Sequence, residues 1–412
     1  MMIVRIAWRN LWRNKTRTGI ILSAIAFSYG LMLFIFGIAD DSYREMESGI
    51  LEAVGGHVLI HGDGYWDFPT GGQVVADVEE RRAELKATAG VDAVAQRIIA
   101  YGLVGTARSS EGAQILGINP DDEGPFFDLE EKLVEGDYFG GERDNPIVLG
   151  VDDADSLGVG IGDRVVVTGT DLDGEMTRGI FFVDGLLEGA AGQAAEGRAY
   201  VEFDELQQIL GYQDSATQLG VRLIDGDERH HFASQWRTDF EGADLEVLTW
   251  DEAVPEFVGL IEMDEAFTYF YVLIIMLIVV LGITNTFLMA VMERVREIGL
   301  LSALGLTPQR IGALIMVETV LLTLISMIIG FGLGLAGHFY MVNVGIDIAA
   351  VAGVEMEVAG LQLGDMVIHS YLDPVRWIVG TVVIFAFICA SSLYPAWKAT
   401  RLAPAEAMRF YE

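Results

Sequence analysis

Four long apolar runs divide the chain, and each is long enough to cross a lipid bilayer as a helix. A bilayer core of about 30 Å needs about 20 apolar residues in helical form. The runs extend from Gly19 to Ala39, Ala266 to Met292, Ile311 to Gly337 and Trp377 to Trp397. Glu318 is the one charged residue within them. The pattern predicts four transmembrane helices, because helices in a soluble core rarely reach this length without more charges.

The segment between the first two runs has a different pattern. A helical pattern from Asp40 to Val54 continues directly out of the first run, and another from Trp250 to Glu265 leads directly into the second. Between them, β-rich runs at 56–62, 163–169, 179–187 and 218–224 alternate with glycine and aspartate turns, and helical patterns fall at 78–87, 151–157 and 203–210. This alternation predicts an α+β domain on two helical stalks, with a second α+β lobe inserted near 120–215.

The first apolar run could also belong to a signal peptide, because basic residues precede it. The hydrophobic region of a signal peptide spans only about 7–15 residues and is followed by a small-residue cleavage site. This run is longer, and no clear cleavage site follows it. An uncleaved membrane anchor is therefore predicted.

Charge is distributed very unevenly along the chain. The net charge is -34, and residues 41–265 contain 49 acidic but only 14 basic residues. Basic residues instead flank the apolar runs, at Arg5, Arg9, Arg13, Lys15, Arg17, Arg294, Arg296, Arg310, Lys398, Arg401 and Arg409. Lys and Arg favour the cytoplasmic side of a membrane. Both termini and the 293–310 loop are therefore predicted to be cytoplasmic, with the acidic segment outside.

The acidity of the external segment has two interpretations, and the charge of the chain excludes one class of partner. The external segment either attracts a basic partner or presents a solvated surface suited to high salt, and charge alone does not identify a partner. A nucleic-acid partner is excluded, because phosphate contacts need an excess of Lys and Arg.

Motifs for catalysis and for metal binding are missing from the sequence. Cys389 is the single cysteine, so no intrachain disulfide can form. The pairs His57/His61 and His230/His231 have neither a cysteine partner nor the glutamate of an HExxH motif. No P-loop and no GxSxG nucleophile elbow occurs. We therefore expect no metal, no cofactor and no enzymatic activity of the chain itself.

Residues 2–14 form an amphipathic pattern at helical spacing. The apolar side holds Ile3, Val4, Ala7, Trp8, Leu11 and Trp12, and the opposite side holds Arg5, Arg9 and Arg13. Such a helix lies in the membrane interface with its arginines toward lipid phosphate. Membrane lipid is therefore an expected partner of Arg5, Trp8, Arg9, Trp12 and Arg13.

The loop from 293 to 310 predicts a short helix from Glu293 to Leu304. Gly305 would cap its end, and Thr307-Pro308 would begin the next helix. An apolar surface of Ile298, Leu301 and Leu304 would have a polar rim of Glu293, Arg296 and Glu297. A short capped helix of this kind between two spans indicates a docking site for a cytoplasmic partner.

Two features of the third apolar run have more than one interpretation. Glu318 lies near the cytoplasmic end, where it could reach the interface or Arg310. Small residues at Gly330, Gly332, Gly334 and Ala336 allow close helix contact, either within a four-helix bundle or at a dimer seam.

Several motifs together resemble the MacB/FtsX/lipoprotein-releasing permease family. They are AWRNLWRNKTRT (7–18), ERVREIGLLSALG (293–305) and YPAWKATRLAPAEAMR (394–409). External stretches such as LVEGDYF, LGVGIGDRVVV and AYVEFDELQQIL resemble the periplasmic core domain of that family. The resemblance covers nearly the whole chain.

The resemblance implies an α-helical membrane protein with a large two-lobed α+β periplasmic domain. Its segments would be a cytoplasmic amphipathic helix (1–18), spans at 19–39, 266–292, 311–337 and 376–397, a periplasmic domain with stalks (40–265), a coupling helix (293–310), an outer loop (338–375) and a cytoplasmic tail (398–412). The two lobes would be 41–118 with 216–265, and 119–215. Localisation in the bacterial inner membrane is implied.

The resemblance also implies a permease driven by a separate ABC ATPase in two copies, paired with a second permease copy or a paralogue. The residues matching the coupling helix are Glu293, Arg296, Glu297, Ile298, Gly299, Leu301, Ala303, Leu304 and Gly305. The layout is most similar to lipoprotein-releasing subunits, which implies lipoprotein cargo and a periplasmic carrier. Two alternatives remain open: export of periplasmic peptides or small molecules with an adaptor, and transmembrane regulation of cell-wall hydrolases.

Overall fold

The computed structural model describes residues 2–69, 72–127, 129–141, 143–172, 174–187, 197–303, 305–347, 357–358, 361–362 and 367–401. The chain divides into two compact units. The helical unit comprises Met1–Glu45, Leu260–Gly353 and Met366–Glu412, and the sheet unit comprises Met46–Gly259 and Val354–Asp365. Helices α2 (Lys15–Val54) and α10 (Pro255–Glu293) contribute to both units.

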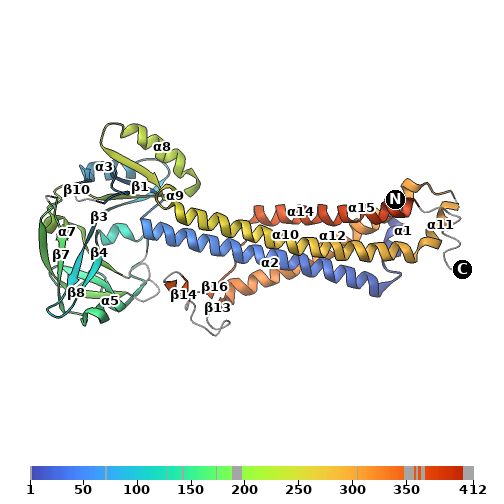
Figure 1. Ribbon diagram of the computed structural model, residues 1–412, viewed down its shortest axis with the longest axis horizontal. Coiled ribbons are helices and arrows are strands. Elements are labelled where there is room, and N and C mark those ends of the chain that lie inside the picture. The colour runs from blue at the N-terminus through green and yellow to red at the C-terminus, as the bar shows by residue number, and fades with distance from the viewer. Residues whose placement is uncertain are drawn as a thin grey trace. The chain divides into compact units, whose positions relative to one another are not determined.

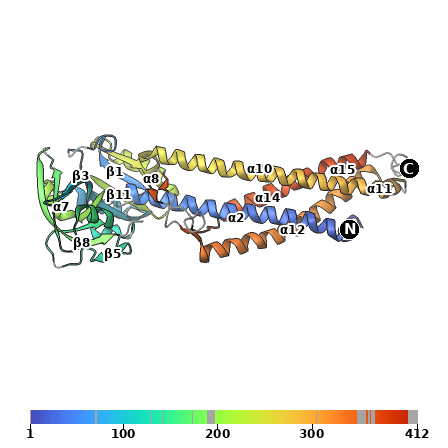
Figure 2. The same ribbon diagram turned by 60° about the horizontal axis from the view of Figure 1, so that its bottom comes forward.

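Long helices dominate the helical unit and run side by side in both ribbon views (Figures 1 and 2). Besides α2 and α10, they are α1 (Met2–Leu11), α11 (Val295–Ala303), α12 (Pro308–Val344), α14 (Pro374–Ser391) and α15 (Leu393–Thr400), with a small strand pair β13 (Ile346–Asp347) and β16 (Val367–Ile368). Four segments of the described chain are long and apolar enough to cross a membrane: Lys15–Val54, Pro255–Glu293, Pro308–Val344 and Pro374–Thr400.

Helices α2 and α12 approach closely through glycine. A Cβ atom on Gly330 would lie 2.5 Å from the Ala26 carbonyl oxygen, and one on Gly334 would lie 2.9 Å from Leu33 Cβ. A Cβ on Gly332, in contrast, would meet nothing within 4 Å in the described structure. Of the two interpretations of this small-residue pattern, packing within one chain therefore accounts for Gly330 and Gly334.

Local sequence signals set most helix ends. Thr307 has extended backbone angles before Pro308, the first residue of α12, and Gly305 has φ +93°, as the predicted caps require. The predicted N-terminal helix ends earlier than residue 14, at Leu11, because the chain turns before α2 begins at Lys15. The hydroxyl of Thr18 then donates to the Leu11 carbonyl at 2.6 Å.

The sheet unit contains a mixed ten-stranded sheet with short helices. Its elements are β1 (Val58–Gly62), β2 (Val75–Ala76), α3 (Val78–Lys86), β3 (Val91–Gly105), β4 (Ser110–Ile118), α4 (Pro120–Glu123), β5 (Leu133–Gly136), β6 (Pro146–Gly150), α5 (Val151–Leu157), β7 (Arg164–Thr170), β8 (Met176–Leu187), β9 (Arg198–Glu202), α7 (Phe203–Leu210), β10 (Ser215–Ala216), β11 (Gln218–Leu223), η1 (Gly226–Glu228), α8 (Arg229–Asp239), β12 (Leu245–Thr249) and α9 (Trp250–Ala253), with the small pair β14 (Glu357–Val358) and β15 (Leu361–Gln362). The strands and helices predicted from the alternating pattern are confirmed as β1, β7, β8, β11, α3, α5 and α7.

The long strand β3 connects two groups of strands. The sheet order is β12-β1-β11-β3-β4-β9-β6-β8-β5, with β7 pairing to β3 and β8. Residues 91–97 of β3 pair with β11, and residues 103–105 pair with β7. Strands from 58–118 and 218–249 therefore occupy one side of the order, and strands from 133–202 occupy the other. One continuous apolar core includes side chains from both groups.

The end of α2 is held within the sheet unit by side chains that bind its free carbonyl groups. The last carbonyls of a helix have no partner inside it. Gln218 Nε2 donates to the Val54 carbonyl at 2.7 Å, and Arg97 Nη1 donates to the Gly55 carbonyl at 2.7 Å. Arg97 also makes two 2.6 Å hydrogen bonds to the Glu123 carboxylate, and both side chains are at most 2% exposed. We call this arrangement the α2 joint.

The beginning of α10 is attached differently. The predicted continuous helix from Trp250 to Glu265 is wrong, because the chain leaves helical geometry at Val254, with φ -130° and ψ 62°. Pro255 explains the break: it lacks an N–H group and disfavours helical angles in the residue before it. The short helix α9 stays on the domain, where Trp66 Nε1 donates to the Ala253 carbonyl at 2.6 Å. We call Val254–Pro255 the α10 joint.

Candidate coupling site

Helix α11 follows α10 after a break at Arg294. Glu293 is the last residue of α10, so the predicted helix from Glu293 to Leu304 is in fact two helices that meet at a bend. The N–H group of Arg294 donates to the Val291 carbonyl at 3.1 Å, and the N–H group of Ile298 donates to the Arg294 carbonyl at 2.9 Å. Movement of α11 therefore acts directly on the end of α10.

The faces of α11 differ from the predicted docking surface. Ile298 is only 9% exposed and packs in an apolar cluster with Val291, Ile311, Ile315, Ala396 and Ala399. Gly299 is buried as well. The prediction that Ile298 contributes an exposed apolar surface is wrong, because the helix turns this side toward α12 and α15.

The exposed side of α11 contains one residue, Leu300, that was not among the predicted coupling residues. Leu300 is 57% exposed, and Arg296 and Ala303 are exposed beside it at helical spacing. Glu293 and Glu297 are also exposed. Leu304 and the side chain of Leu301, which belong to the predicted surface, lie outside the described residues. The spacing 296–300–303 is the signal that could have identified Leu300.

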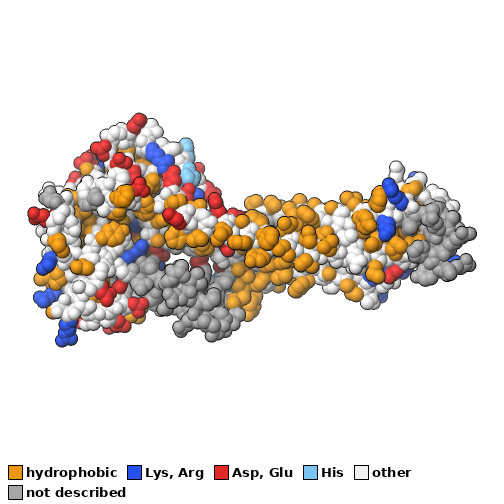
Figure 3. Space-filling view, in the orientation of Figure 1, with side chains coloured by type: hydrophobic (Ala, Val, Ile, Leu, Met, Phe, Trp, Pro, Cys, Tyr) orange, Lys and Arg blue, Asp and Glu red, His pale blue; other side chains and the backbone are white. Residues whose placement is uncertain are grey.

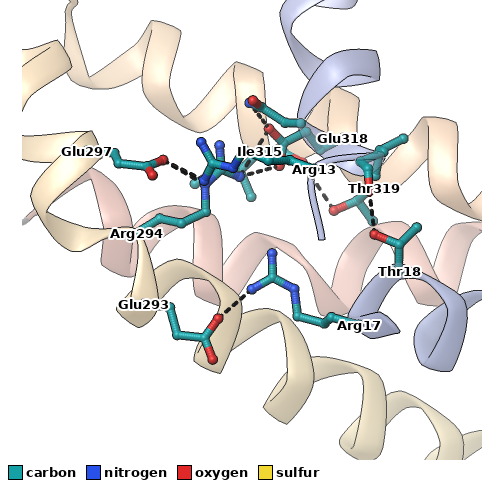
Figure 4. Close-up of polar contacts among 11 residues, drawn as sticks. Arg13, Arg17, Thr18, Glu293, Arg294, Glu297, Ile315, Glu318 and Thr319 are labelled. Carbon is teal, nitrogen blue, oxygen red and sulfur yellow. Dashed lines mark hydrogen bonds and ion pairs between the residues drawn. The ribbon is translucent and has the colours of Figure 1, made fainter. Parts of the chain in front are cut away.

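A polar network joins the α10–α11 bend to the end of α1, to the start of α2 and to α12 (Figure 4). Arg13 pairs with Glu297 at 2.8 Å, Arg17 pairs with Glu293 at 2.7 Å, and Arg294 contacts both Glu297 (3.3 Å) and Glu318 (3.0 Å). Asn10 Nδ2 donates to Glu318 Oε1 at 2.6 Å. We call these seven residues the α1–α11 network. Its three arginines and three glutamates balance in charge.

Glu318 is the central acceptor of this network. Of the two expected alternatives, the membrane interface or Arg310, neither describes the contacts found, because Arg294 and Asn10 bind its carboxylate. The Glu318 side chain is 13% exposed and that of Arg294 is 18% exposed, so each is largely removed from solvent. A charged group inside a membrane helix is costly unless it is paired. The pairing therefore ties α12 to α1 and to the bend between α10 and α11.

Desolvation and the neighbouring arginines act in opposite directions on Glu297. Burial of its carboxyl group raises the pKa, but hydrogen bonds and charge from Arg13 and Arg294 lower it more. The net result is a pKa below the ordinary value. Glu297 therefore stays ionised and keeps its two arginine partners at neutral pH.

Helix α1 packs against its neighbours through Ala7 and Leu11, and the tryptophans on and just after it are exposed. Ala7 and Leu11 are buried, while Trp8 and Trp12 are each 46% exposed, with their rings edge to face at 6.1 Å. Arg5 and Arg9 are exposed. Arg13, predicted to face lipid with them, pairs with Glu297 instead.

A second feature of the helical unit is an apolar groove on α2, α10 and α14. Its volume is about 670 Å³, and Met32, Phe36, Val272, Met276 and Val379 are among its lining residues. Arg376 and Asp373 lie at one end of the lining. Hydrophobic side chains also cover the long helices on the face drawn in Figure 3, whereas Asp and Glu side chains are frequent on the sheet unit.

Sequence comparison places the chain among known permeases. Residues 18–238, more than half of the chain, match the MacB-like periplasmic core domain, and residues 269–404 match the FtsX-like permease C-terminal family. This chain belongs to the MacB/FtsX/LolC family of ABC transporter permeases. The resemblance inferred from its motifs is thereby confirmed. A permease of this family is a membrane subunit that works with an ATPase.

Relatives of this permease include lipoprotein-releasing system proteins. It is 26% identical to the transmembrane protein LolC of Xylella fastidiosa over 72% of this chain and 73% of that protein. LolC of Neisseria meningitidis is 24% identical over 78% and 79% of the two chains. The solved periplasmic region of MacB from Actinobacillus actinomycetemcomitans is 13% identical, covers 49% of this chain and 92% of that chain, and has a TM-score of 0.36.

Proposed function

We propose that this permease transmits ATP hydrolysis on the cytoplasmic side to the external sheet unit and thereby releases lipoproteins from the inner membrane. The described helices support a topology with spans at 19–39, 266–292, 311–337 and 376–397. Both termini and α11 would be cytoplasmic, because basic residues surround them, and the strongly acidic segment 41–265 would be periplasmic.

Coupling is proposed to begin at the exposed side of α11. The ATPase would dock on Arg296, Leu300 and Ala303, with two ATPase copies serving two permease chains. The α1–α11 network supports this role, because paired charges link Glu297 of α11 and the adjoining residues Glu293 and Arg294 to the turn after α1, to α2 and to α12. A force applied to α11 would reach α1, α2 and α12 together instead of bending one loop.

The similarity to LolC, which extends over more than two thirds of both chains, is the observation that supports lipoprotein cargo. The groove of about 670 Å³ on α2, α10 and α14 offers an apolar surface for acyl chains. Acyl chains bind such surfaces because their transfer from water is favourable by about 0.8 kcal/mol per CH₂ group. A periplasmic carrier would then receive the released lipoprotein.

Copurification tests the cargo directly. The tagged permease is extracted from its native membranes in mild detergent, and bound proteins and lipids are identified by mass spectrometry. An ATPase together with acylated lipoproteins is the expected result. An adaptor or a cell-wall hydrolase without any lipoprotein would overturn the cargo proposal and leave the family assignment intact.

Variants at Leu300 test the docking surface. Leu300→Asp should abolish stimulation of the ATPase by the permease, because a carboxylate then faces an apolar contact. Leu300→Met is the matched control, since it conserves volume and polarity and should retain stimulation. Ile298→Asp is unsuitable for this purpose, because Ile298 is buried and the variant would disrupt packing. If the Leu300→Asp variant stimulated the ATPase normally, the ATPase would have to dock at another surface of the permease.

A further inference from the structure

Helices α2 and α10 both lead to the sheet unit, but they are held very differently inside the helical unit. On α2, Gly37 and Asp40 are buried, as are apolar residues from Ile21 to Phe36. On α10, no residue from Pro255 to Ile275 is buried within the described structure, and burial begins at Met276. More than half of α10 therefore contributes no fully buried side chain, and Val272 packs only partly buried against the apolar cluster that holds α2.

The chain segment before α14 is fastened to α2. The N–H group of Tyr371 donates to the Gly37 carbonyl at 2.9 Å, and the N–H group of His369 donates to Asp41 Oδ2 at 3.1 Å. The Arg44 guanidinium lies 3.8 Å from the centre of the Tyr371 ring. Backbone, side-chain and cation–π contacts thus act together here, so α14 and α2 behave as one body at this end.

One side chain of α14 makes polar contacts with both α2 and α10. Arg376 of α14 pairs with Asp40 of α2 through one nitrogen, and through the other it pairs with Glu265 of α10 at 2.5 Å. The same nitrogen is 3.2 Å from the Tyr269 hydroxyl. We call Asp40, Glu265, Tyr269 and Arg376 the Arg376 cluster. Tyr43 of α2 also donates to the Thr268 hydroxyl of α10 at 3.2 Å, and Arg17 of α2 pairs with Glu293 at the other end of α10.

Charge in the Arg376 cluster is unbalanced, since two carboxylates share one guanidinium. Loss of the Glu265 contact leaves Arg376 paired with Asp40, so no buried cation is stranded. The side chain of Glu265 is 41% exposed, whereas that of Asp40 is 7% exposed. Separation at Glu265 therefore returns a half-exposed carboxylate to solvent at small cost, whereas separation at Asp40 would strand a buried one.

We propose that α10 is the moving helix of this permease: it turns about the α10 joint and separates from α14 at Glu265, while α2, α14 and the α2 joint stay fixed. Val254–Pro255 provides the turning point, because a single non-helical residue there connects two helices. A few residues at an element end commonly absorb such a rotation. The proposal depends on the proposed function in one respect: α11, at the other end of α10, would drive the movement.

Paired carboxylate variants test the role of the Arg376 cluster in the full-length chain. Glu265→Gln and Asp40→Asn each remove one negative charge from the same guanidinium, but only Glu265 belongs to α10. Cys389, the single native cysteine, is first replaced by serine. Spin labels at Ser42 and Ala266 then report the α2–α10 distance, and labels at Ser42 and Val375 report the α2–α14 distance.

The distances are measured by pulsed electron resonance in lipid nanodiscs, with an excess of unlabelled chain to suppress signals between copies. Glu265→Gln should lengthen and broaden the α2–α10 distribution, while Asp40→Asn should leave it as in the parent chain. The α2–α14 distribution should be unchanged in both variants, which also shows that they are folded. The proposal would be overturned if Glu265→Gln and Asp40→Asn gave the same α2–α10 distance distribution. It would also be overturned if Glu265→Gln changed the α2–α14 distance as much as the α2–α10 distance.

Hydrogen exchange tests the turning point separately. Pro255→Ala supplies an N–H group that can donate to the Asp251 carbonyl and join α9 to α10, so exchange at residues 256–259 should slow at least about tenfold. Pro374→Ala, at the equivalent first position of α14, should leave this region unchanged. Unaltered exchange in Pro255→Ala would place the turning point elsewhere. Neither experiment contains ATPase or cargo, so their failure leaves the lipoprotein proposal untouched.

Discussion

The α2 joint and the α10 joint connect the same sheet unit to two long helices by opposite means. At the α2 joint, buried side chains from β3 and β11 bind the last carbonyl groups of the helix, and a fully enclosed ion pair supports them. At the α10 joint, a proline prevents the helix from continuing and the following turn is exposed. One joint can transmit torque, whereas the other can absorb rotation.

The Arg97–Glu123 pair should be the costliest part of the α2 joint to remove. Arg97→Ala leaves a carboxylate buried without a counter-charge, so the free energy of unfolding of the sheet unit should fall by about 3–5 kcal/mol. Chemical denaturation of the full-length chain, followed by hydrogen exchange at β3 and β11, measures the loss. The double variant Arg97→Met/Glu123→Leu should recover most of it. A loss below about 1 kcal/mol in Arg97→Ala would contradict the anchored description.

Acid should weaken the strands next to both joints. His61 on β1 is 0% exposed, and burial first, then the charge of Arg97, lowers its pKa to about 4, despite the opposing effect of a hydrogen bond to the Thr217 carbonyl. Because the unfolded chain binds this proton near pH 6.5, stability falls as the pH drops from about 6.5 to 4 and then levels off. The loss from this group amounts to about 3 kcal/mol.

Thermal unfolding across that pH range measures the effect. In His61→Phe, which keeps a flat ring against Tyr65 and Trp66, the unfolding temperature should depend less steeply on pH than in the parent chain. The variant should also keep most of its stability at pH 4. An unchanged slope would assign the acid sensitivity to other groups, among them His57, whose pKa burial also lowers.

Gly55 should tolerate no side chain at the α2 joint. Its φ is +98°, and an added Cβ would lie 1.7 Å from Arg97 Nη1, so Gly55→Ala must displace the arginine. We expect a loss of about 2 kcal/mol, from strain together with the displaced hydrogen bond. Gly49→Ala is a suitable control, because nothing lies within 4 Å of its added Cβ and the position is helical. Denaturation curves of both variants provide the measurement.

The α10 joint should be the least sensitive to change. Pro255→Ala removes no buried contact, so the free energy of unfolding should change by less than about 1 kcal/mol. The midpoint of chemical denaturation compares it with the Gly55 variant. A loss as large as that of Gly55→Ala would show that both joints are anchored, and the contrast between them would disappear.

Much of the local structure could be predicted because its causes are local. The alternation of apolar residues identifies β1, β7 and β8, and Thr307-Pro308 marks the start of α12. The helical pattern continues on both sides of Pro255 and therefore predicts one helix, whereas the structure has a break at Val254. The pattern also predicts an exposed Ile298, because apolar residues near a membrane serve packing and docking alike.

The sequence by itself determined the four apolar spans, their flanking charges, the acidic α+β segment between the first two, and the family. These follow from composition and short-range periodicity, which act on neighbouring residues. Only the tertiary structure decided that Glu318 pairs with Arg294 and Asn10, that Arg376 joins Asp40 to Glu265, and that Arg97 binds the end of α2. These pairs link residues up to 336 positions apart. Their choice of partner depends on distances between packed elements, which no local pattern encodes.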